Sequence, residues 1–77
     1  MPVSENIKRI REAKGVTKTF VANRLGMSLQ GYRYLEDGDV KLDVERMKKI
    51  ANILCIDSAV FLDDKLTDFV IKDMQKA

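Results

Sequence analysis

The amino-acid sequence predicts an all-α fold. Apolar residues recur at intervals of three and four along the chain, which is the spacing of one helix face. A strict alternation of apolar and polar residues, the pattern of a half-buried strand, is absent. The single proline stands at position 2 and so interrupts no helix. With 77 residues, 45% of them hydrophobic, the chain has room for one small domain.

The first predicted helix lies between Ser4 and Gly15. Serine is a common N-cap because its hydroxyl accepts a hydrogen bond from a backbone N–H of the first turn, and glycine commonly ends a helix. The apolar face of this helix consists of Ile7 and Ile10, with Val3 beside them. In the second helix the apolar residues are Phe20, Val21 and Leu25.

The second and third helices are joined by a very short turn. Thr17 caps the second helix, which ends at Gly26. Only Met27 follows before Ser28, the cap of a third helix that ends near Glu36. Glycine takes the left-handed conformation of such an exit without a Cβ penalty. A turn this short holds two helices at a steep angle, which predicts a helix-turn-helix whose second member enters the major groove of DNA.

The third helix has two different faces. Tyr32 and Leu35 stand three residues apart and mark its buried side. The residues left on the opposite side are our candidates for contact with base edges: Leu29, Gln30, Arg33 and Tyr34. Glutamine pairs with adenine, arginine pairs with guanine, and a leucine or tyrosine side chain packs on a thymine methyl.

Alternatives remain open for these side chains. Gln30 and Arg33 are also compatible with a solvated surface, and the hydroxyl of Tyr34 with a phosphate contact. For the motif as a whole, the alternative is a five-helix bundle with no role in nucleic-acid binding.

The second half of the chain predicts three further helices. Asp43 caps a fourth helix, and Asp57 opens a short fifth one around Val60, Phe61 and Leu62. The fourth helix carries a wide apolar stripe of Val44, Met47, Ile50, Ala51 and Leu54. We therefore place a DNA-binding domain at 1–62 and a C-terminal helical extension at 63–77.

The extension is predicted to be amphipathic. Its apolar residues recur at intervals of three and four: Leu66, Phe69, Val70 and Met74. We expect this stripe to join two copies into a homodimer, because a chain this short is marginal alone. Packing on its own domain is the alternative. A further hypothesis makes the chain a protein-interaction module, such as an antitoxin or an adaptor, that binds a regulatory partner through this helix.

Charge and composition limit the functions that are possible for this chain. The net charge is only +2, but the segment up to Lys41 holds eight basic and five acidic residues, and the remainder holds six and seven. A positive N-terminal half suits contact with phosphates. The chain has no histidine and one cysteine, Cys55, which rules out an internal disulfide and a Cys/His zinc site. We read Cys55 as a small buried hydrophobe rather than a redox switch.

No cofactor and no enzymatic activity are expected. The sequence has no paired-carboxylate spacing, no nucleophile with a base and no phosphate loop. It also has no apolar run near the roughly 18 residues of a membrane span, and no pattern of a secretory signal. We expect a cytoplasmic protein with no membrane partner, located at the nucleoid when bound to DNA.

Four segments, taken together, resemble the lambda-repressor and Cro-type helix-turn-helix family, also called the XRE group. They lie in the order 6–17, 22–28, 34–38 and 49–51, and the resemblance covers roughly residues 4–62. It implies a five-helix DNA-binding domain from a bacterium or phage, dimeric on a palindromic operator and more often a repressor than an activator. Residues 63–77 have no counterpart in the minimal family core.

The resemblance also implies roles for individual residues. Leu29, Gln30 and Tyr34 fall on base-reading positions. Lys18, at the start of the second helix, falls on a phosphate contact, and Arg11 and Glu36 match a structural ion pair. With Arg33 included, the full set that we expect at the DNA is Lys18, Ser28, Leu29, Gln30, Arg33, Tyr34 and Lys41.

Two positions and one loop depart from the family pattern. Lys18 stands where glutamine is most common, and Cys55 stands where the family usually has glycine after the fourth helix. The loop 38–42, which holds Lys41, is poorer in basic residues than usual and lacks the usual proline. We therefore expect a single copy to bind DNA weakly and the dimer to bind it tightly.

Overall fold

The computed structural model describes residues 2–75, and within that range it contains five α-helices, one 3-10 helix and no strand. The elements are α1 (Val3–Ala13), α2 (Lys18–Leu25), α3 (Leu29–Glu36), α4 (Val44–Ile53), η1 (Ser58–Leu62) and α5 (Asp64–Met74). The all-α prediction is confirmed, and the short fifth helix expected from the sequence is the 3-10 helix η1.

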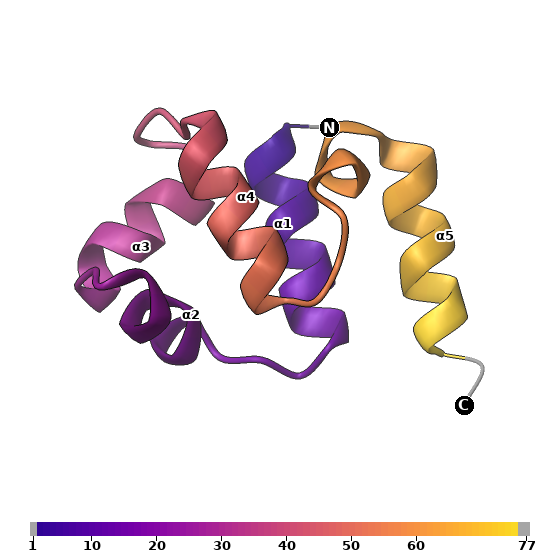
Figure 1. Cartoon of the computed structure of the whole chain (residues 1–77), viewed down its shortest axis with the longest axis horizontal. Coiled ribbons are helices and arrows are strands. Elements are labelled where there is room, and N and C mark those ends of the chain that lie inside the picture. The colour runs from indigo at the N-terminus through magenta and orange to yellow at the C-terminus, as the bar shows by residue number, and fades with distance from the viewer. Residues whose placement is uncertain (1, 76–77) are drawn as a thin grey trace.

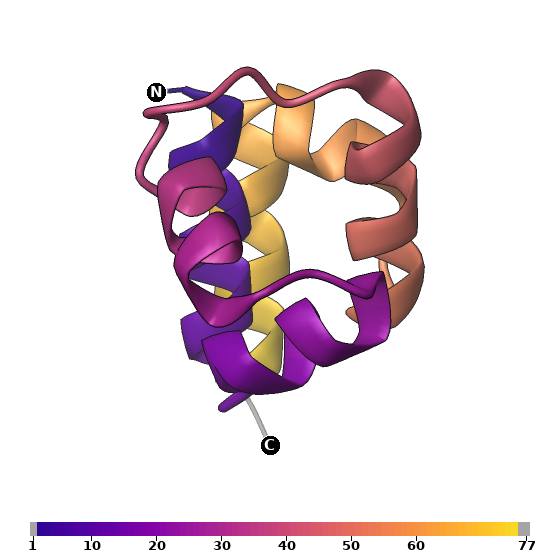
Figure 2. The ribbon, with the colours of Figure 1, turned by 90° about the vertical axis from the view of Figure 1, so that its left-hand side faces the viewer.

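Helix α1 runs through the middle of the molecule. Helices α3 and α5 both contact α1 but lie on different sides of it, and α2 packs against α3 and α4 (Figure 1). The longest dimension of the molecule is 33 Å, with α2 and α3 at one end of it and α5 at the other (Figures 1 and 2). The faces of α3 and α5 that turn away from α1 therefore point in roughly opposite directions.

The helices pack around one core, and their outer faces lie outside it. The fully or nearly buried apolar residues are Ile7, Ile10, Val21, Ala22, Tyr32, Leu35, Met47, Ile50, Ala51, Leu54 and Phe61. Ala22 on α2 is among these buried residues, and α2 packs against α3. The inward positions expected for Tyr32 and Leu35 are confirmed.

Side-chain caps define most of the helix starts. The Thr17 hydroxyl accepts a hydrogen bond from the Phe20 N–H at 3.1 Å, and the Asp43 carboxylate accepts one from the Arg46 N–H at 2.7 Å. Each such cap satisfies a backbone donor that the helix leaves free. The expected cap at Ser4 is wrong. The N-cap of α1 is Pro2, two residues earlier, and its ring fixes φ near the observed −63°.

Helix α5 is held to α1 and η1 by polar contacts. The Asn6 side chain donates to the Phe61 carbonyl at 3.0 Å and to an Asp64 carboxylate oxygen at 2.9 Å. Thr67 is buried, and its hydroxyl donates to the Val60 carbonyl at 2.7 Å. An Arg9–Asp68 ion pair closes the outer side of this contact. The C-terminal helix thus packs on its own domain, which is the alternative that the sequence left open.

The predicted apolar stripe of α5 is divided by this packing. Met74 packs against the protein's own core, and Val70 is half-buried. Leu66 and Phe69 are exposed, Phe69 to 67% of its surface. Intrachain packing, which the sequence left open, therefore accounts for one part of the stripe and leaves another part free.

Two expectations about burial are wrong, those for Val44 and Cys55. Val44 was placed in the apolar stripe of the fourth helix, but it is the first residue of α4 and lies beyond the core, 62% exposed. Phe20, one of the apolar residues of the second helix, is also exposed, and the Arg24 guanidinium lies over its ring, 5.0 Å from the ring centre. Cys55 is exposed, not buried, and has a φ of 59°, the left-handed conformation that its family position reserves for glycine.

Candidate nucleic-acid interface

The turn between α2 and α3 fixes the orientation of α3. Gly26 ends α2 with φ 70° and ψ 27°, a conformation open to glycine without strain. The Met27 N–H donates to the Ala22 carbonyl at 2.9 Å, which satisfies an acceptor at the end of α2. Two residues later α3 begins, capped by the Ser28 hydroxyl, which accepts from the Gly31 N–H at 3.0 Å. The helix-turn-helix expected from the sequence is therefore formed.

A buried ion pair holds the other end of α3 to α1. The Arg11 guanidinium donates to both carboxylate oxygens of Glu36, at 2.9 Å from Nε to Oε2 and 2.8 Å from Nη2 to Oε1. The remaining nitrogen, Nη1, donates to the Val16 carbonyl at 2.8 Å. The Arg11 side chain is 7% exposed and that of Glu36 is 0% exposed. The pair implied by the family resemblance is thus formed, and it links the middle helix to the C-terminal turn of α3.

Tyr32 completes the buried side of α3. Its hydroxyl is buried and has no partner in hydrogen-bond geometry within residues 2–75. Burial raises the pKa of Tyr32 above its ordinary value of 10.0, and the nearby Glu36 carboxylate adds to this effect. For Arg11, the hydrogen bond to Glu36 raises the pKa of the guanidinium. Both side chains, Arg11 and Tyr32, therefore keep their protons across the neutral range.

The outer face of α3 carries the predicted base-reading residues. Gln30, Arg33 and Tyr34 are exposed, and Leu29 is half-exposed at the first turn. Since Tyr32, Leu35 and Glu36 fix the rotation of the helix, these four side chains are presented together on one side. Ser28 is exposed as well, and although its oxygen caps the helix, its O–H remains available as a donor.

Gly31 lies beside the N-cap of α3. A Cβ at Gly31 would lie 3.1 Å from the Ser28 hydroxyl oxygen and 3.5 Å from the Met27 methyl carbon. The missing side chain therefore points toward the cap and the turn, and its absence leaves room for both.

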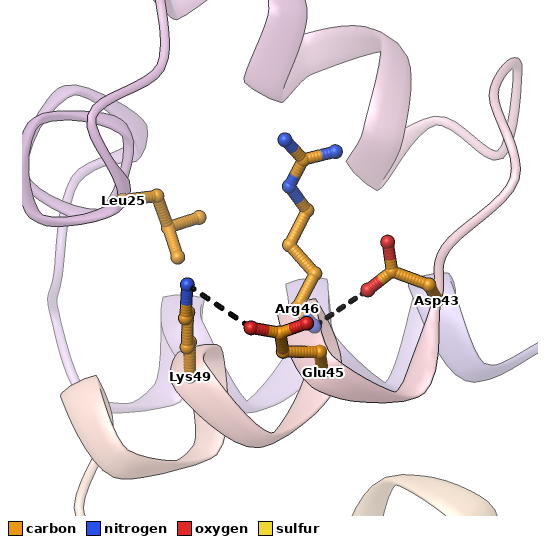
Figure 3. Close-up of a pocket in the computed structure, with 5 residues that line it drawn as sticks. All are labelled: Leu25, Asp43, Glu45, Arg46 and Lys49. Carbon is orange, nitrogen blue, oxygen red and sulfur yellow. Dashed lines mark hydrogen bonds and ion pairs between the residues drawn. The ribbon is translucent and has the colours of Figure 1, made fainter.

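Basic side chains flank α3. Lys18, at the start of α2, is half-buried, and Lys41 is exposed in the loop between α3 and α4. A third position, missed in the sequence, is Arg46 on α4. Figure 3 shows the Arg46 side chain reaching away from α4 within a pocket that Leu25, Asp43, Glu45 and Lys49 also line.

The charges in this pocket differ in how they are paired. The Lys49 ammonium lies 3.7 Å from the Glu45 carboxylate, an exposed pair one helical turn apart. The Arg46 guanidinium makes no ion pair or hydrogen bond with other side chains of residues 2–75, since only its backbone N–H binds Asp43. Sequence reasoning missed Arg46 because spacing alone does not distinguish a free guanidinium from one neutralised within its own helix.

Residues 2–75 lack two further kinds of feature, a metal-binding cluster and a membrane-spanning helix. Within the described part of the chain, no three histidine, cysteine, aspartate or glutamate side chains gather in a group that could hold a metal ion. None of the helices in residues 2–75 is both long enough and apolar enough to cross a membrane.

Comparisons with known proteins agree with this arrangement. Residues 7–60 match the family model described as helix-turn-helix. One relative is the SPbeta prophage-derived uncharacterized HTH-type transcriptional regulator YonR of Bacillus subtilis (strain 168). It is 32% identical over 68 residues, which cover 88% of this chain and 55% of the relative, so the chain spans about half the length of that protein. No solved structure matches. The chain belongs to the helix-turn-helix family, of the lambda-repressor and Cro type that its sequence motifs resemble.

Proposed function

We propose that this protein is a sequence-specific regulator of transcription that binds double-stranded DNA and acts as a repressor. In this proposal, a dimer inserts two copies of α3 into successive major grooves of a palindromic operator. The observation that carries it is the division of α3 into a locked inner face and a polar outer face. The inner face is fixed by the Arg11–Glu36 pair, while Gln30 and Arg33 project outward.

Each outward side chain has a distinct task in this proposal. Gln30 and Arg33 read base edges through paired hydrogen bonds, and Leu29 and Tyr34 pack on or beside them. Lys18, Ser28, Lys41 and the unpaired Arg46 contact phosphates, which position the helix without reading sequence.

We favour repression over activation because repression requires only that the protein occupy the operator. A bound dimer excludes other proteins from the operator, so repression needs no surface beyond the DNA-binding one. Such a protein works in the cytoplasm of a bacterium, at the nucleoid when bound to DNA, and the relative from a Bacillus subtilis prophage supports a bacterial or phage origin.

The experiment that tests this function is in vitro selection of bound duplexes, followed by binding measurements on the selected site. We expect an inverted repeat with half-sites about one helical turn apart. Gln30→Ala should relax the preference at one base pair by about 1–3 kcal/mol, whereas Lys18→Ala should weaken binding to all duplexes and reduce the salt slope by about one. Failure of the folded protein to bind any duplex at low salt would refute the proposal.

A second candidate function is binding of a regulatory protein partner, as an antitoxin or adaptor does. The observation that favours it is the exposed pair Leu66 and Phe69 on α5, at the end of the molecule away from α3. Deleting residues 64–77 is a poor test because Thr67 and Met74 belong to the packed structure. Phe69→Asp should instead abolish co-purification of a stoichiometric partner and leave DNA binding unchanged. Co-purification that persists in this variant would argue against the α5 surface.

A further inference from the structure

An exposed aromatic ring stands beside a shallow hollow at the start of α2. Phe20 is 43% exposed, and the hollow next to it, about 290 Å³ in volume, is lined by Gly15, Val16, Thr17 and Phe20 itself. We name it the α2 hollow. The loop that leads from α1 into α2 forms it, on the lower side of both ribbon views (Figures 1 and 2). A single exposed apolar side chain is ordinary, so the surroundings of the ring decide what it can bind.

The chain around the α2 hollow carries only positive charge. Residues 13–35 contain no acidic residue and four basic ones: Lys14, Lys18, Arg24 and Arg33. Because the whole chain has 14 basic and 12 acidic residues, the remainder has ten basic and twelve acidic ones. Lys14 and Lys18 directly flank the residues that line the hollow. This end of the molecule therefore has a positive field that attracts anionic partners, and the rest does not.

Arg24 supplies a free cation beside the ring. Its guanidinium lies over Phe20, 5.0 Å from the ring centre, and the side chain is exposed. It forms no ion pair with an acidic side chain of residues 2–75. A guanidinium that rests on a ring keeps its N–H donors available for a carboxylate. The hollow therefore offers an apolar surface and a hydrogen-bonding cation next to each other.

The N-terminus of α2 adds to the attraction for an anion. Thr17, which lines the hollow, is the N-cap of α2, and its hydroxyl accepts a hydrogen bond from the Phe20 N–H at 3.1 Å. The first turn of α2 contains no acidic residue and begins with Lys18. The partial positive charge of the helix N-terminus is therefore not offset within the helix and adds to the charge of this lysine.

We propose that the α2 hollow binds an acidic segment of a regulatory protein. One apolar side chain of that segment packs on Phe20 and Val16, and carboxylates beside it pair with Arg24 and Lys18. The inference rests on the proposed function, because it names a regulator of DNA binding. Lys18 is a phosphate contact in that function, so the acidic segment and the operator compete for the same side chain.

DNA is the other anionic macromolecule that this surface could meet, and it fits the hollow less well. The outer surface of a duplex consists of phosphates and sugars, and its bases are reached through the grooves. A phosphate satisfies Lys18 but leaves the Phe20 ring without an apolar partner. A protein segment can carry acidic and apolar side chains side by side, and exposed aromatic residues are common anchors of protein interfaces.

The test uses the full chain and two synthetic octapeptides. In the first, three glutamates stand on each side of a leucine–phenylalanine pair, and in the second two serines replace that pair, so both peptides have the same charge. Fluorescence anisotropy measures their binding. We expect the apolar peptide to bind about tenfold more tightly or better, because it buries a large side chain. This ratio should not change with salt, since both peptides lose the same electrostatic attraction.

Two matched variants locate the contact. Phe20→Ser should remove the preference for the apolar peptide, whereas Phe69→Ser, at a phenylalanine on α5 that is 67% exposed, should keep it. Neither residue belongs to the buried core, and circular dichroism checks the fold of both variants. Arg24→Gln should weaken both peptides alike, by up to about fivefold, because it removes one exposed ion pair from each complex.

A half-site duplex completes the test. The apolar peptide should displace the duplex from the wild-type chain, and Phe20→Ser should leave the affinity for the duplex within about twofold of the original. Equal affinities of the two peptides would overturn the inference, and so would a preference that Phe69→Ser removes and Phe20→Ser does not. If Phe20→Ser weakens the duplex as much as the apolar peptide, the hollow belongs to the DNA interface and the inference is wrong. Selective binding of the apolar peptide by a chain that binds no duplex would support the inference and refute the proposed function.

Discussion

The buried pair between Arg11 and Glu36 should be the most sensitive charged contact in the protein. Three hydrogen bonds join the two side chains, at 2.8, 2.9 and 3.2 Å, and both side chains are buried. Replacing Glu36 by glutamine keeps the volume but leaves the guanidinium buried without a counter-charge. Breaking one partner of a buried pair costs about 3–5 kcal/mol, because the desolvation of the other charge is no longer compensated.

This loss is large for a domain of this size. A 77-residue domain has a total stability of about 4–12 kcal/mol. Each kcal/mol shifts the melting temperature of a 60–100-residue domain by about 4–8 °C, so Glu36→Gln should lower it by roughly 12 °C or more. The hydrogen bond to Glu36 raises the pKa of Arg11 from an already high value, so the guanidinium stays charged from acidic to moderately alkaline solution. The stability that this raised pKa contributes is lost only in strongly alkaline solution, and the difference between variants should be constant from pH 6 to 9.

Urea unfolding of a double-mutant cycle measures the effect. The cycle comprises the wild type, Glu36→Gln, Arg11→Met and the double variant. We expect the double variant to be more stable than the sum of the two single losses predicts, because it leaves no unpaired charge in the core. A loss below 1 kcal/mol for Glu36→Gln, or strictly additive losses in the cycle, would show that the pair is not the buried, coupled contact described above.

Three further predictions concern single residues. Cys55→Gly should raise stability by about 0.5–1.5 kcal/mol because it relieves the left-handed φ of 59°, whereas Cys55→Ala should not; equal melting temperatures for the two variants would contradict this. Tyr32→Phe should leave stability at pH 7 equal or higher, because the lost hydroxyl has no partner. Since burial raises the pKa of Tyr32 above 10.0, only the unfolded chain releases this proton near pH 10, and stability should fall above that pH by up to about 1.4 kcal/mol per unit. Tyr32→Phe should remove this fall in a urea titration, and the control Tyr34→Phe should keep it. Arg46→Ala should weaken binding to all duplexes in a salt titration with no change in sequence preference, and Lys49→Ala should have a smaller effect.

Much of the fold could be predicted from local sequence patterns. The caps at Thr17, Ser28 and Asp43 and the glycine at position 26 act within a few residues, so their roles can be read from the chain itself. The failure at Val44 has a different cause. Its apolar side chain stands at helical spacing, but its burial depends on whether another element covers it. Periodicity states which residues share a face and does not state where the core ends.

The candidate site also contains residues that could be predicted from local spacing and residues that could not. The two faces of α3 could be predicted because Tyr32 and Leu35 define them by spacing alone. Arg46 could not, since its importance lies in the lack of a partner, and its neighbour Lys49 carries the same charge but is paired with Glu45. The C-terminal stripe was predicted as one surface, yet Met74 packs inward while Phe69 stays exposed. A helix with apolar residues on a broad face can serve two contacts, and only the tertiary structure assigns each residue to one of them.

The buried pair also explains how so short a helix can present a defined face. Helix α3 has eight residues, just over two turns, which is too short to be stable without its packing. A rotation by one residue, about 100°, would bring Arg33 to the inward position of Tyr32, turn Leu35 toward solvent and move Glu36 away from Arg11. Tyr32 and Leu35 alone would tolerate small rotations, because apolar contact is non-directional. The two-pronged bond from Arg11 to Glu36 is directional, and a misplaced Glu36 leaves a charge buried without its partner. In our proposal the Arg11–Glu36 pair does not contact DNA. By fixing the rotation of α3, it determines which side chains of that helix contact DNA.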